Sequence, residues 1–269
     1  MRFLCLHGMG TNPRILEAQI GLLRAQLPGS HEFVYLPGEV ECDAAQGVLT
    51  IYPGPYLCYY DLPTADQVAD AHDLVLTFIE DEGPFDAVIG FSQGAALASS
   101  VMLRRAKDPS LEPLFQLAIF ICASLPFDLD APPVVVDKAP GGRLKFLNAA
   151  AADGGREIPQ SSVGAQSLIQ ELHSQGYGGM LKDGMHILRR FHLRTQPGGK
   201  FNMGVPTVNI VGKKDGYFQQ GLSLAELGGS RGTVILDHGA GHEVPRDVLS
   251  VRKMTRVVQD AVEKVGFQC

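Results

Sequence analysis

The residues best suited to covalent chemistry lie in the pentapeptide Gly90-Phe-Ser-Gln-Gly, which fits the pattern G-x-S-x-G. An apolar run, residues 87–91, leads into Ser92, and a run of small helix-forming residues, 95–99, follows it. In such a strand-turn-helix setting, glycines two residues to either side of the serine let strand and helix pack closely beneath the turn. The helix N-terminus also favours negative charge on a nearby substrate oxygen. The pattern therefore predicts that Ser92 is a catalytic nucleophile.

A serine hydroxyl becomes a good nucleophile only when a base accepts its proton, and the chain offers eight histidines. In a hydrolase with this serine motif, the histidine lies on a loop after the last strand. His242 fits, because it follows the apolar run 233–236 and precedes a helical pattern. Gly239 and Gly241 would let its loop bend back toward Ser92. We expect His242 to be the general base, with His238, which stands directly beside that run, as the alternative.

The acid that orients the histidine must follow another strand. Asp215 ends the segment 205–215, which has a strand pattern and then a turn. Asp237 and Asp247 are alternatives, although both lie so close to His242 in sequence that a separate acid loop would have no role. We expect Asp215 to be the acid.

An oxyanion needs two backbone N–H donors, one from the residue after the nucleophile and one from a loop after an early strand. The first of these is Gln93. The second is expected to be Met9, because the segment Leu6-His-Gly-Met-Gly-Thr-Asn directly follows the first strand pattern. We expect His7 to brace this loop rather than to take part in proton transfer.

Short apolar runs alternate with longer helical patterns, which is typical of a mostly parallel sheet covered by helices on both faces. The runs predict strands at residues 2–6, 32–36, 87–91, 117–123 and 207–211, with a sixth at 233–236. The helical patterns cover residues 14–26, 65–82, 94–107 and 248–265. The chain is therefore expected to form one α/β domain, residues 1–269.

Residues 128–202 interrupt this alternation with prolines, paired glycines and weak amphipathic segments. Since the segment lacks a strand pattern of its own, it is expected to form a lid inserted between two strands. Its apolar side chains are candidates to line a pocket for an acyl chain, and the residues singled out are Leu168, Leu172, Met180 and Met185.

Composition excludes some classes of function. A net charge of -6 and the lack of a dense basic cluster argue against nucleic-acid binding. The few clustered arginines, Arg189, Arg190 and Arg194, are expected on a solvated helix face. Five scattered cysteines predict reduced thiols, and no run is long enough for a membrane span, so a cytoplasmic location is expected. No G-x-G-x-x-G loop follows a strand, and no metal or organic cofactor is expected.

Several motifs together resemble the fungal-type FSH serine hydrolase family, and they cover nearly the whole chain except the insertion. They are LHGMGTN at 6–12, IYPGPYLCYY at 51–60, DAVIGFSQGAALAS at 86–99, FICASLPF at 120–127, VGKKD at 211–215 and GHEVP at 241–245. The resemblance implies an α/β-hydrolase fold and a triad that falls on Ser92, Asp215 and His242. It also implies esterase or thioesterase activity, in some members the release of a polyketide from an acyl-carrier domain in secondary metabolism. The insertion 128–202 departs from simple members and leaves the substrate open.

Three functions remain compatible with these residues. The first is hydrolysis of an acyl ester or thioester, which require the same catalytic groups. The second is acyl transfer or cyclisation, in which a substrate nucleophile replaces water behind a closed lid. The third is a ligand-binding protein that keeps the fold without catalysis. An intact Ser, Asp and His set in chain order favours catalysis.

Overall fold

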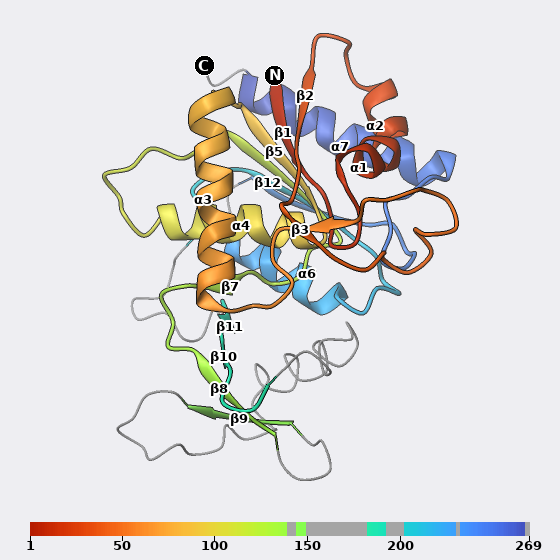
Figure 1. The fold of residues 1–269 in the computed structure, drawn as a ribbon. Helices are drawn as coiled ribbons and strands as arrows, with labels where there is room; N and C mark the ends of the chain where they lie inside the picture. The colour runs from red at the N-terminus through yellow and green to blue at the C-terminus, as the bar shows by residue number, and fades with distance from the viewer. Residues whose placement is uncertain (139–143, 149–181, 192–201, 230–231, 267–269) are drawn as a thin grey trace.

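A computed structural model describes residues 1–138, 144–148, 182–191, 202–229 and 232–266 (Figure 1). Its centre is a six-stranded sheet with the order β13-β12-β6-β5-β1-β2, in which every neighbouring pair is parallel. The strands are β1 (Arg2–Leu6), β2 (Glu32–Leu36), β5 (Ala87–Phe91), β6 (Leu117–Ile121), β12 (Thr207–Val211) and β13 (Thr233–Asp237). The predicted α/β class and all six strands are confirmed, with differences of one or two residues at their ends.

The central strands are buried throughout, and mostly apolar, because helices cover both of their faces. Every residue of β5, β6 and β12 is buried. In β1 the side chains alternate, so that Leu4 and Leu6 join one apolar cluster and Phe3 and Cys5 join another. Since successive side chains of a strand point to opposite faces, the sheet separates two cores.

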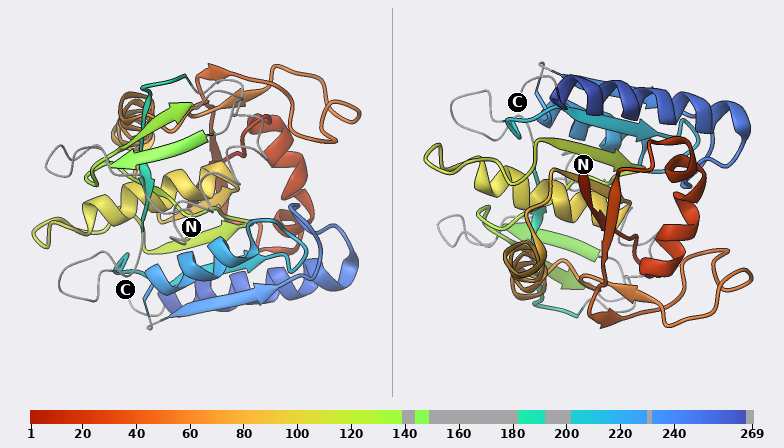
Figure 2. Two further views of the ribbon diagram at one scale, coloured as in Figure 1. Left: turned by 90° about the horizontal axis from the view of Figure 1, so that it is seen from below. Right: turned by 90° about the horizontal axis from the view of Figure 1, so that it is seen from above.

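The helices form two layers, one on each side of the sheet (Figure 2). One core receives side chains from α1 (Pro13–Gln19), α2 (Gly21–Gln26) and α7 (Val248–Gly266). The other receives side chains from α3 (Ala65–Glu82), α4 (Gln93–Arg105) and α6 (Phe218–Leu227). The prediction of a single helix over 14–26 is wrong. The helix breaks at Ile20, which ends α1 and begins α2, and the glycine that follows weakens continuous helix there. Helix α6 was not predicted.

The expectation that residues 128–202 lack strands is also wrong. Strands β8 (Val134–Lys138), β9 (Leu144–Asn148) and β10 (His186–Ile187) form a small antiparallel sheet in the order β10-β8-β9. A further strand, β11 (Arg189–Arg190), pairs with β7 (Phe127–Asp128). Strand β8 begins with three consecutive β-branched valines, which favour a strand, but the prolines before it obscured the pattern.

Arg189 and Arg190 are not on a helix face as expected. Arg189 and Arg190 form β11, and the guanidinium of Arg190 lies 4.1 Å from the centre of the Phe127 ring. Burial lowers the pKa of Arg190 to about 10. Pairing with β7 draws this arginine inward, where the aromatic face partly replaces water. Arg194 lies outside the described residues.

Candidate active site

The structure brings three of the predicted residues into one hydrogen-bonded chain. Nε2 of His242 lies 2.8 Å from Oγ of Ser92, and Nδ1 of the same ring lies 2.8 Å from Oδ2 of Asp215. Ser92 directly follows β5, Asp215 lies in the turn after β12, and His242 lies in the loop after β13. All three therefore sit at the carboxyl edge of the parallel sheet, where the loops of α/β folds gather functional groups.

The turn that carries Ser92 is strained, and close packing maintains it. Ser92 has φ 53° and ψ -117°, a positive φ that few residues other than glycine adopt. A Cβ on Gly90 would lie 2.4 Å from Cα of Ala95, and one on Gly94 would lie 2.3 Å from the carbonyl oxygen of Leu6. Only glycine fits at these two positions, as the sequence motif predicts.

Asp215 is a buried carboxylate held by several donors. Its side chain is 2% exposed, and Oδ1 accepts a hydrogen bond from the backbone N–H of Tyr217 at 2.8 Å. Burial by itself would raise the pKa of this carboxyl group, but hydrogen bonding to His242 and to Tyr217 outweighs it, and the pKa lies below its usual value. The group is therefore ionised at neutral pH and can stabilise a protonated imidazole.

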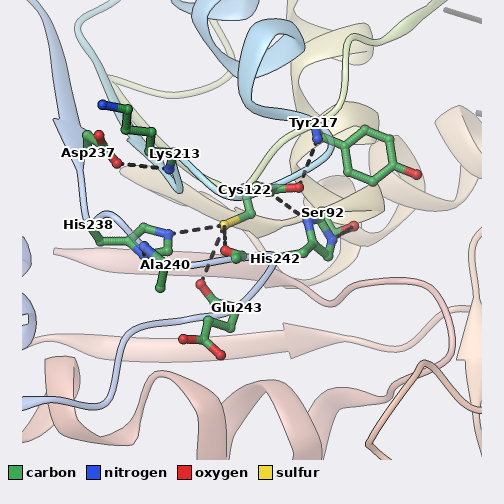
Figure 3. Close-up of polar contacts among 11 residues, drawn as sticks. Ser92, Cys122, Lys213, Tyr217, Asp237, His238, Ala240, His242 and Glu243 are labelled. Carbon is green, nitrogen blue, oxygen red and sulfur yellow. Dashed lines mark hydrogen bonds and ion pairs between the residues drawn. The ribbon is translucent and has the colours of Figure 1, made fainter.

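Two aromatic rings fix the imidazole of His242. The ring centre lies 5.3 Å from that of Phe91 and 5.1 Å from that of Tyr217. The side chain remains 34% exposed, so a substrate can approach it from solvent. Figure 3 shows Tyr217 close to this ring and to Ser92.

The loop predicted to complete an oxyanion hole lies directly against the nucleophile. A Cβ on Gly8 would lie 3.3 Å from Cβ of Ser92, so only the backbone of this loop fits there. Gln93 is the first residue of α4, where backbone N–H groups lack helical partners. Its side chain accepts from the N–H of Tyr59 at 2.9 Å and donates to the carbonyl of Tyr60 at 2.7 Å. The assignment of the Met9 and Gln93 N–H groups as oxyanion donors stays a prediction.

His7 has the surroundings of a structural residue. It is fully buried, its Nε2 accepts from the N–H of Gly38 at 2.9 Å, and Nδ1 lies 2.8 Å from the carbonyl of Gly8. Since Nε2 is an acceptor, the proton must be on Nδ1, which then donates to Gly8. Burial lowers the pKa of His7 to about 4, so the ring is neutral at pH 7. These contacts tie the loop of Gly8 to the segment at Gly38, as a bracing role requires.

The structure gives the alternative base and acids other partners. Nε2 of His238 lies 3.5 Å from Sγ of Cys122. Oδ1 of Asp237 accepts from the N–H groups of Lys213 and Gly239, as Figure 3 shows for Lys213. Asp247 accepts from the N–H of Ser250 at the start of α7. Of these candidate bases and acids, only His242 and Asp215 belong to the hydrogen-bonded chain that ends at Ser92.

Cys122 is the site neighbour that sequence reasoning missed. It directly follows β6, the strand between β5 and β12, so its position at that strand end was the one available signal. Among the described residues, the ligand atoms of Cys122, Asp215 and His242 lie within 4.8 Å of one another, a spacing that could hold a metal ion. Asp215 and His242 already bond to each other, however, and His242 also bonds to Ser92. The contacts therefore have the form of a hydrogen-bonded chain of serine, histidine and aspartate.

Of the four predicted pocket residues, only Met185 lies in the described part of the chain. Leu168, Leu172 and Met180 lie outside the described residues. Met185 is partly buried against an apolar core cluster, and its carbonyl accepts from the N–H of Val136 on β8. Its contact with an acyl chain stays a prediction.

A sheet of this topology with a serine at the turn after β5 defines an α/β hydrolase. The model of the family described as "Serine hydrolase (FSH1)" matches residues 1–254, and the chain belongs to this family. The resemblance inferred from the motifs is therefore confirmed, and the protein is a serine hydrolase.

Several relatives match over most of their length. Esterase FPY3 of Fusarium mangiferae is 36% identical, with 98% of each chain covered. Esterase alnB of Emericella nidulans is 32% identical, with 97% of this chain and 96% of the relative covered. Hydrolase FUB4 of Fusarium oxysporum f. sp. lycopersici is 30% identical, with 91% and 92% covered.

Solved structures agree on the fold. A carboxylesterase from Mesorhizobium loti superposes with a TM-score of 0.52 at 13% identity, with 96% of this chain and 88% of that chain covered. Esterase PE8 gives a TM-score of 0.50 at 17% identity, with 97% and 92% covered. In the described part of the chain, no helix has the length and apolar character needed to cross a membrane.

Proposed function

We propose that this enzyme hydrolyses an acyl ester or thioester through an acyl-Ser92 intermediate, with His242 as general base and Asp215 as the orienting acid. The observation that supports this most directly is the chain Ser92–His242–Asp215, in which both hydrogen bonds measure 2.8 Å. His242 takes the proton of Ser92 as Oγ attacks the acyl carbon, and then gives it to the leaving alcohol or thiol. Water activated by the same ring releases the acyl group.

The charges support the same sequence of steps. Because the pKa of Asp215 is lowered, its carboxylate holds the proton of Nδ1 and leaves Nε2 free to accept. In our proposal the N–H groups of Met9 and Gln93 bind the oxyanion of the tetrahedral intermediate. The N-terminus of α4, which begins at Gln93, adds a favourable dipole.

We further propose that the acyl group is a polyketide or related chain, delivered by an acyl-carrier domain in fungal secondary metabolism. The family resemblance and the fungal sources of the relatives support this, and two relatives are named as esterases. The inserted segment 128–202, as a lid on a single domain, would select the acyl chain. The described cysteines, Cys5, Cys42, Cys58 and Cys122, are free thiols. Reduced thiols fit the cytoplasmic location that we propose.

The test is labelling with a fluorophosphonate probe, followed by assays on p-nitrophenyl esters and acyl thioesters of increasing chain length. Ser92→Ala should abolish labelling and lower turnover by several orders of magnitude, because only binding and the oxyanion hole remain. Ser99→Ala is the matched control, since Ser99 lies on the helix that follows Ser92 and its hydroxyl donates to the carbonyl of Ala96 within that helix. Labelling of Ser92→Ala at the wild-type rate would sink the assignment. If an added alcohol is present, formation of its ester in place of the free acid would show acyl transfer.

A further inference from the structure

Cys122 occupies a distinctive position next to the proposed triad. It is 1% exposed, directly follows β6, and has φ 49°, in the left-handed region that few residues other than glycine adopt. Its N–H donates to the carbonyl of Ile210 on β12 at 2.8 Å. The strand end is thus fixed to its neighbour, in a conformation that puts the thiol beside the acid and base.

The thiol contacts both segments that carry the acid and the base. Sγ lies 3.4 Å from the carbonyl oxygen of Glu243 and 3.9 Å from that of Gly241, the two residues that flank His242. A carboxylate oxygen of Asp215 also lies within 4.8 Å of Sγ. In Figure 3, dashed lines join the sulfur of Cys122 to His238 on one side and to Glu243 on the other.

The thiol has a proton to donate at any working pH of the enzyme. Burial raises the pKa of Cys122, and the negative charge of Asp215 raises it further. A single S–H can serve one strong acceptor, and a hydrogen bond to the nearby Asp215 carboxylate is stronger than one to a neutral carbonyl. Interaction with Cys122 also helps to lower the pKa of Asp215. The large sulfur atom meanwhile fills the space against the carbonyls on either side of His242.

We propose that Cys122 is a positioning residue, whose S–H holds the Asp215 carboxylate in line with His242 and whose sulfur supports the histidine loop. This inference rests on the proposed function, because it assigns the thiol a role only if Asp215 and His242 serve Ser92. Cys122 acts through Asp215 and touches no substrate. It should therefore affect kcat and leave KM nearly unchanged.

The test compares Cys122→Ala with Cys122→Ser, because the hydroxyl of serine restores a donor that alanine lacks. For Cys122→Ala we expect kcat on a p-nitrophenyl ester to fall about 10- to 100-fold, as for loss of a hydrogen bond to a charged group, with KM changed less than threefold. Cys122→Ser should recover most of the lost kcat. Thermal unfolding of both variants separates this recovery from stability, since both remove the buried sulfur.

The pH profile gives a readout that simple packing would not move. Asp215, His238, His242 and Glu243 are the titratable groups around the thiol. Without the S–H, the Asp215 carboxylate is less stabilised and attracts a proton more strongly. The acid limb of kcat/KM should therefore move to higher pH in Cys122→Ala, but not in Cys122→Ser. In His238→Asn it should stay in place, which excludes titration of His238 as its origin.

The labelling results test the proposed function, and the cysteine variants test the role of Cys122 separately. If the wild-type protein is not labelled, or if Ser92→Ala still is, the proposed function fails. If labelling depends on Ser92, the cysteine variants decide alone. Wild-type kcat in Cys122→Ala, or equal losses in both cysteine variants with an unmoved acid limb, would show that the thiol only fills space.

Discussion

Asp215→Asn changes the proposed acid while it keeps the shape of the side chain. Oδ1 of Asp215 accepts from the N–H of Tyr217, and Oδ2 faces Nδ1 of His242 at 2.8 Å. In the amide, the oxygen can keep the bond from Tyr217, and the NH₂ group then points at Nδ1. Nδ1 must then accept, so the neutral ring carries its proton on Nε2 and presents a donor to Ser92. His242 could no longer take the serine proton.

The size of this effect follows from the loss of base function with binding intact. In a Ser-His-Asp site of the same geometry, the change to asparagine costs on the order of 10⁴ in turnover. This is about 5 kcal/mol in the activation free energy. We expect a loss of that size in kcat with little change in KM, because Asp215 is 2% exposed and cannot reach the substrate. Folding should persist, since the two side chains have nearly equal volume.

The assay is kcat on a p-nitrophenyl ester, together with the rate of fluorophosphonate labelling. Asp237→Asn and Asp247→Asn are the controls, because each aspartate accepts backbone N–H bonds that an asparagine oxygen can also accept. Both should stay within a few-fold of wild type. If Asp215→Asn keeps more than a tenth of wild-type turnover, or if a control is the crippled variant, the acid has been misassigned.

Two further substitutions test the turn and the lid. Gly94→Ala should lower stability by about 1–3 kcal/mol and Tm by several degrees, because the added Cβ would lie 2.3 Å from the carbonyl oxygen of Leu6. Gly21→Ala should not lower the Tm, because the space around its added Cβ is open. Equal Tm values for the two variants in thermal unfolding would contradict the packing argument. Met185→Gln should lower kcat/KM for long acyl esters much more than for an acetyl ester, if Met185 contacts the acyl chain. Equal effects on both esters would remove Met185 from substrate selection.

The sequence was informative where structure depends on neighbouring residues. The turn at Ser92 is such a case at Gly90, where an added Cβ would meet Ala95 of the same strand-turn-helix unit, whereas Gly94 is required by the carbonyl of Leu6 on β1. The buried strands were also clear, since a strand covered on both faces is apolar at most positions. The break at Ile20 is marked only by the glycine that follows it, and the hairpin of β8 and β9 comes directly after prolines that obscured its pattern. Strands β10 and β11 were missed because they pair with segments far away in the chain, as β11 does with β7. Local propensity does not encode such pairings.

Partners far apart in the chain were the hardest to predict. His238 and His242 have nearly the same sequence setting, and only the direction of each side chain separates them: one turns to Cys122 and the other to Ser92. Cys122 itself carried no motif, because its contacts join residues about 120 positions apart, as in its bond to the carbonyl of Glu243. A single sequence cannot reveal a contact of that kind.

The order of the strands explains why the end of β6 is a sensitive position. In the sheet order β13-β12-β6-β5, the strand ends carry His242, Asp215, Cys122 and Ser92 in turn. Neighbouring strands lie about 4.8 Å apart, so β5 and β13 are separated by about 14 Å, yet His242 and Ser92 are in hydrogen-bond contact. The histidine loop must therefore cross above β12 and β6 to reach the serine. A side chain at the end of β6 lies under that crossing, and this is why one thiol can support the acid and the base together.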